Sequence, residues 1–205
     1  MGRKKKRISS KILNRNHKGQ KRAFNKDELR NILFTSVYKH RQFCLLVLLG
    51  CCTGLRVNEL VNVTKKDLQD KSFTYYSSKQ RKYIHKQVLP IFYIWFKELG
   101  FKFCDLDKYL FIGARSKQPL KQDYIAKLLK YYCKKIGLTT NDIKNISTHT
   151  LRRTYAKLII DDLGESLSTL HKIKELFQHS TIDTTIRYLG YQSKFKSDEL
   201  NNVWF

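Results

Sequence analysis

The apolar run from Phe43 to Cys52 constrains the fold of this chain more than any other stretch. It is too short to span a bilayer, so it predicts a helix that is buried within a folded domain. The dipeptide Thr53-Gly54 follows it, and glycine often ends a helix because it adopts the left-handed conformation easily. The run therefore predicts a domain built around one buried helix.

The rest of the chain is predicted as an α+β domain, mostly helical with one small antiparallel sheet. β-branched and aromatic residues mark Phe73–Tyr76 as a strand, and Gln87–Pro90 is predicted as its partner across a basic hairpin. A further short strand is predicted at Tyr109–Ile112. Apolar periodicity, capping residues and helix-ending glycines predict further helices over residues 26–37, 55–61, 91–99, 123–136, 148–159, 167–177 and 181–188.

The chain carries a large excess of positive charge. Forty-one Lys and Arg residues against seventeen Asp and Glu give a formal net charge of +24. This excess indicates a polyanionic partner, with nucleic acid as the first expectation and an anionic membrane surface as its rival. Residues 1–22 hold ten Lys or Arg and predict a disordered basic arm, which either lies along DNA phosphates or is a solvated or targeting tail.

Cysteine usage and motif content exclude several classes of protein. The five cysteines are an odd number, mostly within apolar helical runs, which predicts reduced core residues in a reducing compartment. No Cys or His spacing is typical of zinc, and no glycine-rich phosphate loop is present. We therefore expect no metal and no cofactor.

The segment Gln178–Tyr188 carries the first functional signal. Ser180 and Asp183 have the spacing of a helix cap, and Ile182, Ile186 and Leu189 then form a predicted buried stripe. Tyr188 lies about 200° around the helix from Ile186, so its hydroxyl is predicted to point away from that stripe. This position suits a nucleophile, although a single tyrosine is more often a packing residue.

Other polar residues suggest what such a tyrosine attacks. Arg56 begins one predicted helix, His149 and Arg152 share a face at the start of another, and His179 precedes the helix of Tyr188. Two guanidinium groups at helix starts form a good anion cradle. Each residue also has a plainer interpretation, such as a surface ion pair of Arg56 with Glu59.

Three stretches together resemble the signature boxes of the tyrosine recombinase (phage integrase) family. They are Thr53-Gly54-Leu55-Arg56-Val57-Asn58-Glu59-Leu60, His149-Thr150-Leu151-Arg152-Arg153-Thr154 and residues 177–188. The resemblance covers residues 23–190 as a catalytic domain, between the arm at 1–22 and a tail at 191–205. It is greatest to short single-domain members such as the fimbrial DNA invertases, since no amino-terminal core-binding domain is matched. Phe177-Gln178-His179 replaces the usual Leu-Gly-His.

The resemblance implies a metal-independent enzyme that breaks and rejoins DNA through a 3′-phosphotyrosyl intermediate. A hairpin lysine is the least certain member of its catalytic set, with Lys82 as the alternative to Lys79. The implied catalytic residues are Arg56, Lys79, His149, Arg152, His179 and Tyr188.

The same resemblance implies how the protein assembles. The expected partners are double-stranded DNA, further copies in a homotetramer on that DNA, and an accessory DNA-bending protein. The free protein is expected to be a monomer or weak oligomer, with the tail at 191–205 exchanged between protomers or folded back on its own domain. The expected location is the cytoplasm of a prokaryote, at the nucleoid, with a protein encoded by a mobile element or an organelle as the alternatives. Two alternatives are a DNA-binding regulator of the same fold and a DNA-relaxing enzyme like the type IB topoisomerases.

Overall fold

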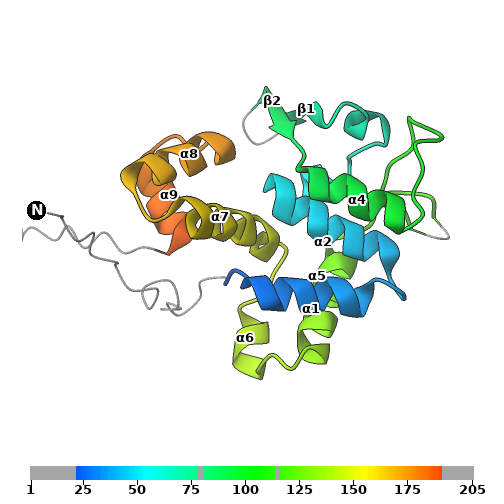
Figure 1. Ribbon diagram of the computed structural model, residues 1–205, viewed down its shortest axis with the longest axis horizontal. Helices are drawn as coiled ribbons and strands as arrows, with labels where there is room; N and C mark the ends of the chain where they lie inside the picture. Colours follow the sequence, from blue (N-terminus) through cyan, green and yellow to red (C-terminus); the bar gives the residue numbers. More distant parts are fainter. Residues whose placement is uncertain (1–21, 78–80, 114–115, 191–205) are drawn as a thin grey trace, which may run out of the picture. The chain divides into compact units, whose positions relative to one another are not determined.

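The computed structural model describes residues 22–77, 81–113 and 116–190. These residues fall into two compact units, one ending at Gly164 and one beginning at Glu165. The larger unit holds α1 to α7 and a β-hairpin, and the smaller unit holds α8 and α9 (Figure 1). The fold is α+β and mostly helical, as the sequence predicts. The predicted arm up to residue 21 and the predicted tail at 191–205 lie outside the described residues.

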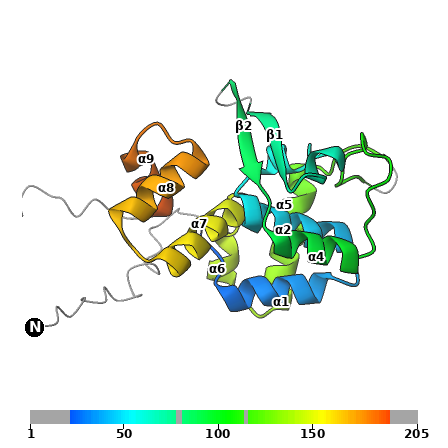
Figure 2. The same ribbon diagram turned by 45° about the horizontal axis from the view of Figure 1, so that its top comes forward.

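Helix α2 (Arg41–Thr53) is the centre of the larger unit (Figure 2). Every residue from Phe43 to Thr53 is buried, which confirms the prediction from the apolar run. Gly54 follows with a φ of 65°, and its N–H donates to the Gly50 carbonyl at 2.9 Å. The helices that pack against α2 include α1 (Lys26–Ser36), α3 (Val57–Leu60), α4 (Pro90–Glu98) and α7 (His149–Leu163).

Gly50 lies close to side chains of two of these helices. A Cβ at this position would lie 3.0 Å from Leu151 Cδ1 on α7 and 3.1 Å from Leu60 Cδ1 on α3. Both distances are tighter than ordinary carbon–carbon contact. The absence of a side chain at residue 50 therefore sets the spacing between α2 and the helix that begins at His149.

The hairpin consists of β1 (Ser72–Ser77) and β2 (Lys82–Gln87), paired antiparallel. Ser77 lies opposite Lys82. The predicted return strand Gln87–Pro90 is therefore wrong, since β2 ends where that prediction begins. Pro90 instead opens α4, because a proline has no N–H to leave unpaired in the first turn of a helix.

The predicted strand at Tyr109–Ile112 is also wrong. Tyr109 and Ile112 make isolated bridges, to Thr64 and to Pro119, and no ladder extends between them. The remaining elements of the larger unit are the short 3₁₀ helix η2 (Lys66–Leu68), α5 (Gln122–Lys135) and α6 (Thr140–Lys144).

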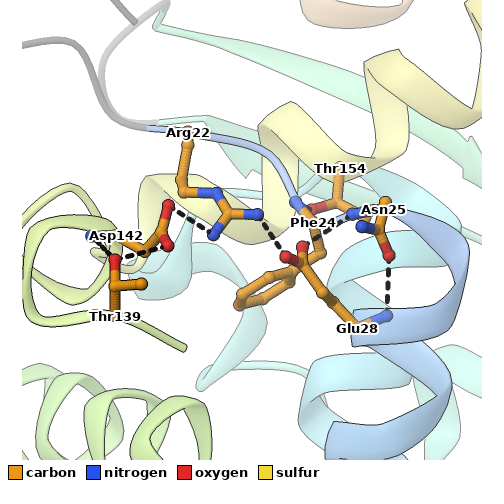
Figure 3. Close-up of polar contacts among 7 residues, drawn as sticks. All are labelled: Arg22, Phe24, Asn25, Glu28, Thr139, Asp142 and Thr154. Carbon is orange, nitrogen blue, oxygen red and sulfur yellow. Dashed lines mark hydrogen bonds and ion pairs between the residues drawn. The ribbon is translucent and has the colours of Figure 1, made fainter. Parts of the chain in front are cut away.

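The start of the described chain is fastened to three helices (Figure 3). Arg22 forms an ion pair with Glu28 of α1, and its Nη1 lies 3.0 Å from Asp142 Oδ1 of α6. The backbone N–H of Phe24 donates to Thr154 Oγ1 of α7 at 2.9 Å, and the Phe24 side chain is fully buried. These contacts fix the entry of the chain against the helix that carries Arg152.

The smaller unit is a pair of helices, α8 (Leu167–Phe177) and α9 (Ile182–Leu189), which contact each other. The cap of α9 is Thr181, whose Oγ1 accepts from the Thr184 N–H at 3.2 Å. The predicted cap at Ser180 is therefore wrong by one residue. It is Thr181 that has the extended backbone from which a hydroxyl reaches the first turn.

The predicted buried stripe of α9 is also different in the structure. Ile182, Ile186 and Leu189 are only partly buried, whereas Thr185 is fully buried. Thr185 Oγ1 lies 2.9 Å from His179 Nδ1. A hydrogen bond to His179, three residues before the start of the helix, thus replaces part of the expected apolar contact.

The junction between α8 and α9 yields a stability prediction at Gln178. Gln178 has φ 54° and ψ 44°, a left-handed conformation that costs an L-residue with a Cβ about 1 kcal/mol. Gln178→Gly should raise the free energy of unfolding by about 0.5–1 kcal/mol, as measured by urea denaturation. Gln69→Gly is the matched control, because Gln69 has φ −63° and glycine should destabilise there. A loss of stability in the Gln178 variant would contradict the prediction.

All five cysteines are free in the structure. Cys44, Cys51, Cys52 and Cys133 are buried and Cys104 is exposed, which agrees with the prediction of reduced core residues. Burial raises the pKa of the Cys44 thiol to about 11 and that of Cys133 to about 12. In the described part of the chain, no helix has the length and apolar character needed to cross a membrane.

Candidate active site

Arg56 and Glu59 form a paired unit at the start of α3. The Arg56 N–H donates to Glu59 Oε2 at 2.8 Å, and Arg56 Nη1 donates to Glu59 Oε1 at 2.9 Å. The two side chains are only 21% and 12% exposed. The ion pair that the sequence offered as a plain interpretation therefore exists, but it is partly buried. Partial burial makes it a rigid support for the guanidinium group.

Arg152 reaches the same part of the molecule from α7. It is 4% exposed, and its Nη1 donates to the Gly54 carbonyl at 2.6 Å. Gly54 stands two residues before Arg56, so the two predicted arginines are brought together around the junction of α2 and α3. His149 occupies the first position of α7, one turn before Arg152, and is exposed.

The hairpin adds two residues to this cluster. Ser77 Oγ donates to Glu59 Oε1 at 3.2 Å, so the end of β1 touches the Arg56–Glu59 pair. Lys86 on β2 is 5% exposed, and burial together with the neighbouring Arg152 lowers its pKa to about 8. Lys82 is exposed, and the predicted Lys79 lies outside the described residues.

Lys86 is not among the predicted catalytic residues, although the sequence contains a signal for its burial. Ile84, Lys86 and Val88 alternate along the chain, and all three are buried. This period of two places Lys86 on the inner face of the hairpin. Because the second strand was predicted at Gln87–Pro90, this alternation of buried residues was not assigned to a strand.

The smaller unit holds the predicted nucleophile. The Tyr188 ring lies against His179 and Phe177, with ring centroids 5.5 Å apart in each pair. Tyr188 is partly buried, so it is neither a core residue nor a fully exposed one. The hydrogen bond between His179 Nδ1 and Thr185 orients the imidazole ring beside the tyrosine.

The predicted residues thus form two groups. Arg56, His149 and Arg152 belong to the larger unit, where Glu59 and the hairpin join them. His179 and Tyr188 belong to the smaller unit and are neighbours there. The first group can hold an anion, because cationic side chains outnumber the carboxylate between them. In the second, the Tyr188 ring lies beside an imidazole, and its hydroxyl oxygen is buried.

Comparison with known proteins decides the family. The pattern of the Phage integrase family matches residues 20–194. The chain belongs to the phage integrase family. The resemblance of the three boxes is therefore confirmed, and the match covers nearly the whole chain rather than one motif.

Several proteins that resemble this phage integrase family chain are longer than it. A probable integrase/recombinase of Acholeplasma phage L2 is 31% identical over 145 residues, which cover 69% of this chain and 46% of the phage protein. The structure of XerA recombinase has a TM-score of 0.65 at 18% identity, covering 92% of this chain and 65% of that chain. The structure of XerH bound to its difH substrate before cleavage has a TM-score of 0.61 at 22% identity. The match covers 89% of this chain and 54% of the XerH chain. The chain thus spans about half the length of the phage relative.

Proposed function

We propose that this protein is a site-specific DNA recombinase that breaks and rejoins duplex DNA through a 3′-phosphotyrosyl link to Tyr188. The observation that carries the proposal is the buried cluster in which Arg152 and the Arg56–Glu59 pair meet beside the hairpin. Such a cluster suits a phosphodiester, because guanidinium groups bind two phosphate oxygens at once. Family membership and the DNA-bound XerH structure support DNA as the substrate.

In the proposed reaction the Tyr188 oxygen attacks the scissile phosphorus and the bond to the 5′-oxygen breaks. Arg56 and Arg152 hold the non-bridging oxygens and stabilise the charge of the pentavalent transition state. Glu59 supports this role by fixing the Arg56 side chain. The covalent link conserves the energy of the broken bond, so rejoining needs no nucleotide.

The proton transfers are assigned to the remaining predicted residues. His149 acts near the tyrosine as a general base or hydrogen-bond donor, and His179 donates a hydrogen bond to the phosphate. A hairpin lysine, Lys79 or Lys82, protonates the departing 5′-oxygen. The orientation of His179 by Thr185 supports its part in this scheme.

Covalent trapping tests the proposed function. The protein is incubated with fragments of its own flanking DNA that carry nicks, so that the cleaved strand end diffuses away and the adduct accumulates. A protein–DNA adduct that survives denaturation, mapped to one position, is the expected result. Binding without any adduct would indicate a regulator of the same fold. Adducts at many sites with relaxation of supercoils would indicate a topoisomerase instead.

We propose further that the protein acts as a homotetramer on DNA, with residues 195–205 exchanged between protomers and an accessory protein that bends the DNA. Deleting residues 195–205 should leave single-site cleavage measurable but abolish the synapsis of two sites. Sedimentation of wild-type and truncated protein with a two-site DNA checks this. A truncated protein that still assembles tetramers and exchanges strands would show that the tail folds back on its own domain.

A further inference from the structure

Lys86 is buried among apolar residues on the inner face of the hairpin. Its neighbours along the inner face of β2 are the buried residues Ile84 and Val88, and Phe73 lies opposite it on β1. Lysine is rarely buried, because removing an ammonium group from water is costly. An apolar residue would fill this place at lower cost. The charge therefore calls for an explanation outside the packing of the hairpin.

The charged groups that act on Lys86 come from two helices. They are the guanidinium groups of Arg152 on α7 and Arg56 on α3, and the carboxylate of Glu59 on α3. The Glu59 carboxylate already accepts two hydrogen bonds from Arg56 and one from Ser77. Within this group three cations thus share one carboxylate.

Tyr75 of β1 belongs to the same surroundings but adds no charge. Its hydroxyl is influenced by Glu59, Arg152 and Arg56, and burial raises its pKa well above the usual value. Tyr75 therefore stays neutral throughout the range in which Lys86 titrates. Arg56, Arg152, Lys86 and Glu59 together carry more positive than negative charge, which favours an incoming anion.

We propose that Lys86 is a third cationic group of the scissile-phosphate site, and that entry of the phosphate draws a proton from solvent onto its amine. The inference rests on the proposed function and adds a residue that the three family boxes do not contain. Protonated Lys86, Arg56 and Arg152 together with Glu59 leave two net positive charges. Two charges match the two negative charges of the pentavalent transition state. Lys86 keeps its proton through the reaction, which distinguishes it from the residue that protonates the 5′-oxygen.

The proposal predicts how phosphate binding depends on pH. Burial and Arg152 lower the pKa of Lys86 to about 8 in the free protein, so the amine is charged below that pH and neutral above it. A bound phosphate favours the charged form, so its affinity is full below pH 8 and falls as the pH rises through 8. Between pH 7 and pH 9 the loss is about tenfold, provided that the pKa of the bound form lies above 9.

The first experiment does not depend on DNA cleavage. Dimethyl phosphate, a phosphodiester monoanion that does not itself titrate here, serves as the probe. The pKa of Lys86 is followed by ¹³C NMR of its ε-carbon, with and without dimethyl phosphate, at ionic strength matched with sodium chloride. The expected result is a pKa that rises by about one unit or more, and the Lys86→Arg variant identifies the signal by its loss. An unchanged pKa overturns the proposal.

The second experiment measures cleavage of the DNA found by covalent trapping. Lys86→Met should slow cleavage by about 100-fold, with no rescue by a 5′-bridging phosphorothiolate whose leaving group needs no proton. Lys86→Arg should retain more activity than Lys86→Met, because arginine stays charged at every pH used. The matched control is Lys97→Met, since Lys97 is exposed on α4. Equal thermal stability of Lys86→Met and wild type will exclude unfolding as the cause.

The outcomes separate this inference from the proposed function. If wild-type protein forms the adduct and Lys86→Met forms it equally fast, the function stands and the role of Lys86 is refuted. Full rescue by the phosphorothiolate would also refute it, because Lys86 would then be the proton donor. If no adduct forms at all, the proposed function fails, and the dimethyl phosphate titration still decides whether Lys86 responds to a phosphodiester.

Discussion

Tyr188→Phe is expected to abolish the covalent protein–DNA adduct while leaving DNA binding and folding unchanged. The substitution removes one oxygen atom and keeps the ring that lies against Phe177 and His179. Cleavage should fall by at least about 10⁴-fold, because no other group supplies the attacking oxygen at this position. The measurement is gel separation of denatured reactions with the nicked substrate, alongside a binding titration with the same DNA.

Tyr131→Phe is a suitable control for this experiment. Tyr131 is 47% exposed on α5, so losing its hydroxyl should change neither cleavage nor binding. An adduct formed by Tyr188→Phe would show that another tyrosine attacks the DNA. Tyr191, three residues further along the chain, would then be the next residue to replace.

Arg152→Lys is the second large effect that we expect. Lysine keeps the positive charge but cannot bond to two phosphate oxygens in a fixed plane, and it also gives up the fork that reaches the Gly54 carbonyl. Cleavage by the bound protein should fall by about 10²–10³-fold, whereas the affinity for DNA should change by less than about threefold. Single-turnover cleavage at saturating protein separates the two quantities.

The neighbouring Arg153 provides the matched control for Arg152. It is only partly buried on the same helix turn, and Arg153→Lys should leave the rate of cleavage within about twofold. Arg56→Lys should behave like Arg152→Lys, since it loses the same geometry on the other side of the site. A loss of binding with normal cleavage by the bound fraction would reduce both arginines to simple phosphate contacts.

Features that depend on neighbouring residues could be predicted from the sequence. The apolar run from Phe43 to Cys52 predicts the buried helix α2, and Gly54 predicts where that helix ends. The cap of α1 is a capping box between Asn25 and Glu28, which lie three residues apart. Each of the three family boxes is a short continuous stretch of sequence. The boxes predict that Arg56 and Arg152 belong to one cluster, as the structure has them.

Features that depend on the register between distant segments could not be predicted. The position of β2 is fixed by its pairing with β1, and a basic hairpin offers no apolar signal for where the second strand begins. The second strand was therefore predicted too late in the sequence, so that Lys86 fell outside it and its burial was not predicted. Similarly, the burial of Thr185 rather than Ile182 follows from its hydrogen bond to His179, which only the folded pair of helices creates.

The bare backbone at Gly50 connects the interior of the protein to its chemistry. Leu151, which lies 3.0 Å from the place of the missing Cβ, is the residue directly before Arg152. A methyl group at residue 50 would push the first turn of α7 outward by a few tenths of an ångström. Because Arg152 is held at its position by the Gly54 carbonyl, such a shift would misalign the guanidinium before it unfolded the domain. The packing at residue 50 therefore sets the position of Arg152 as well as the stability of the core.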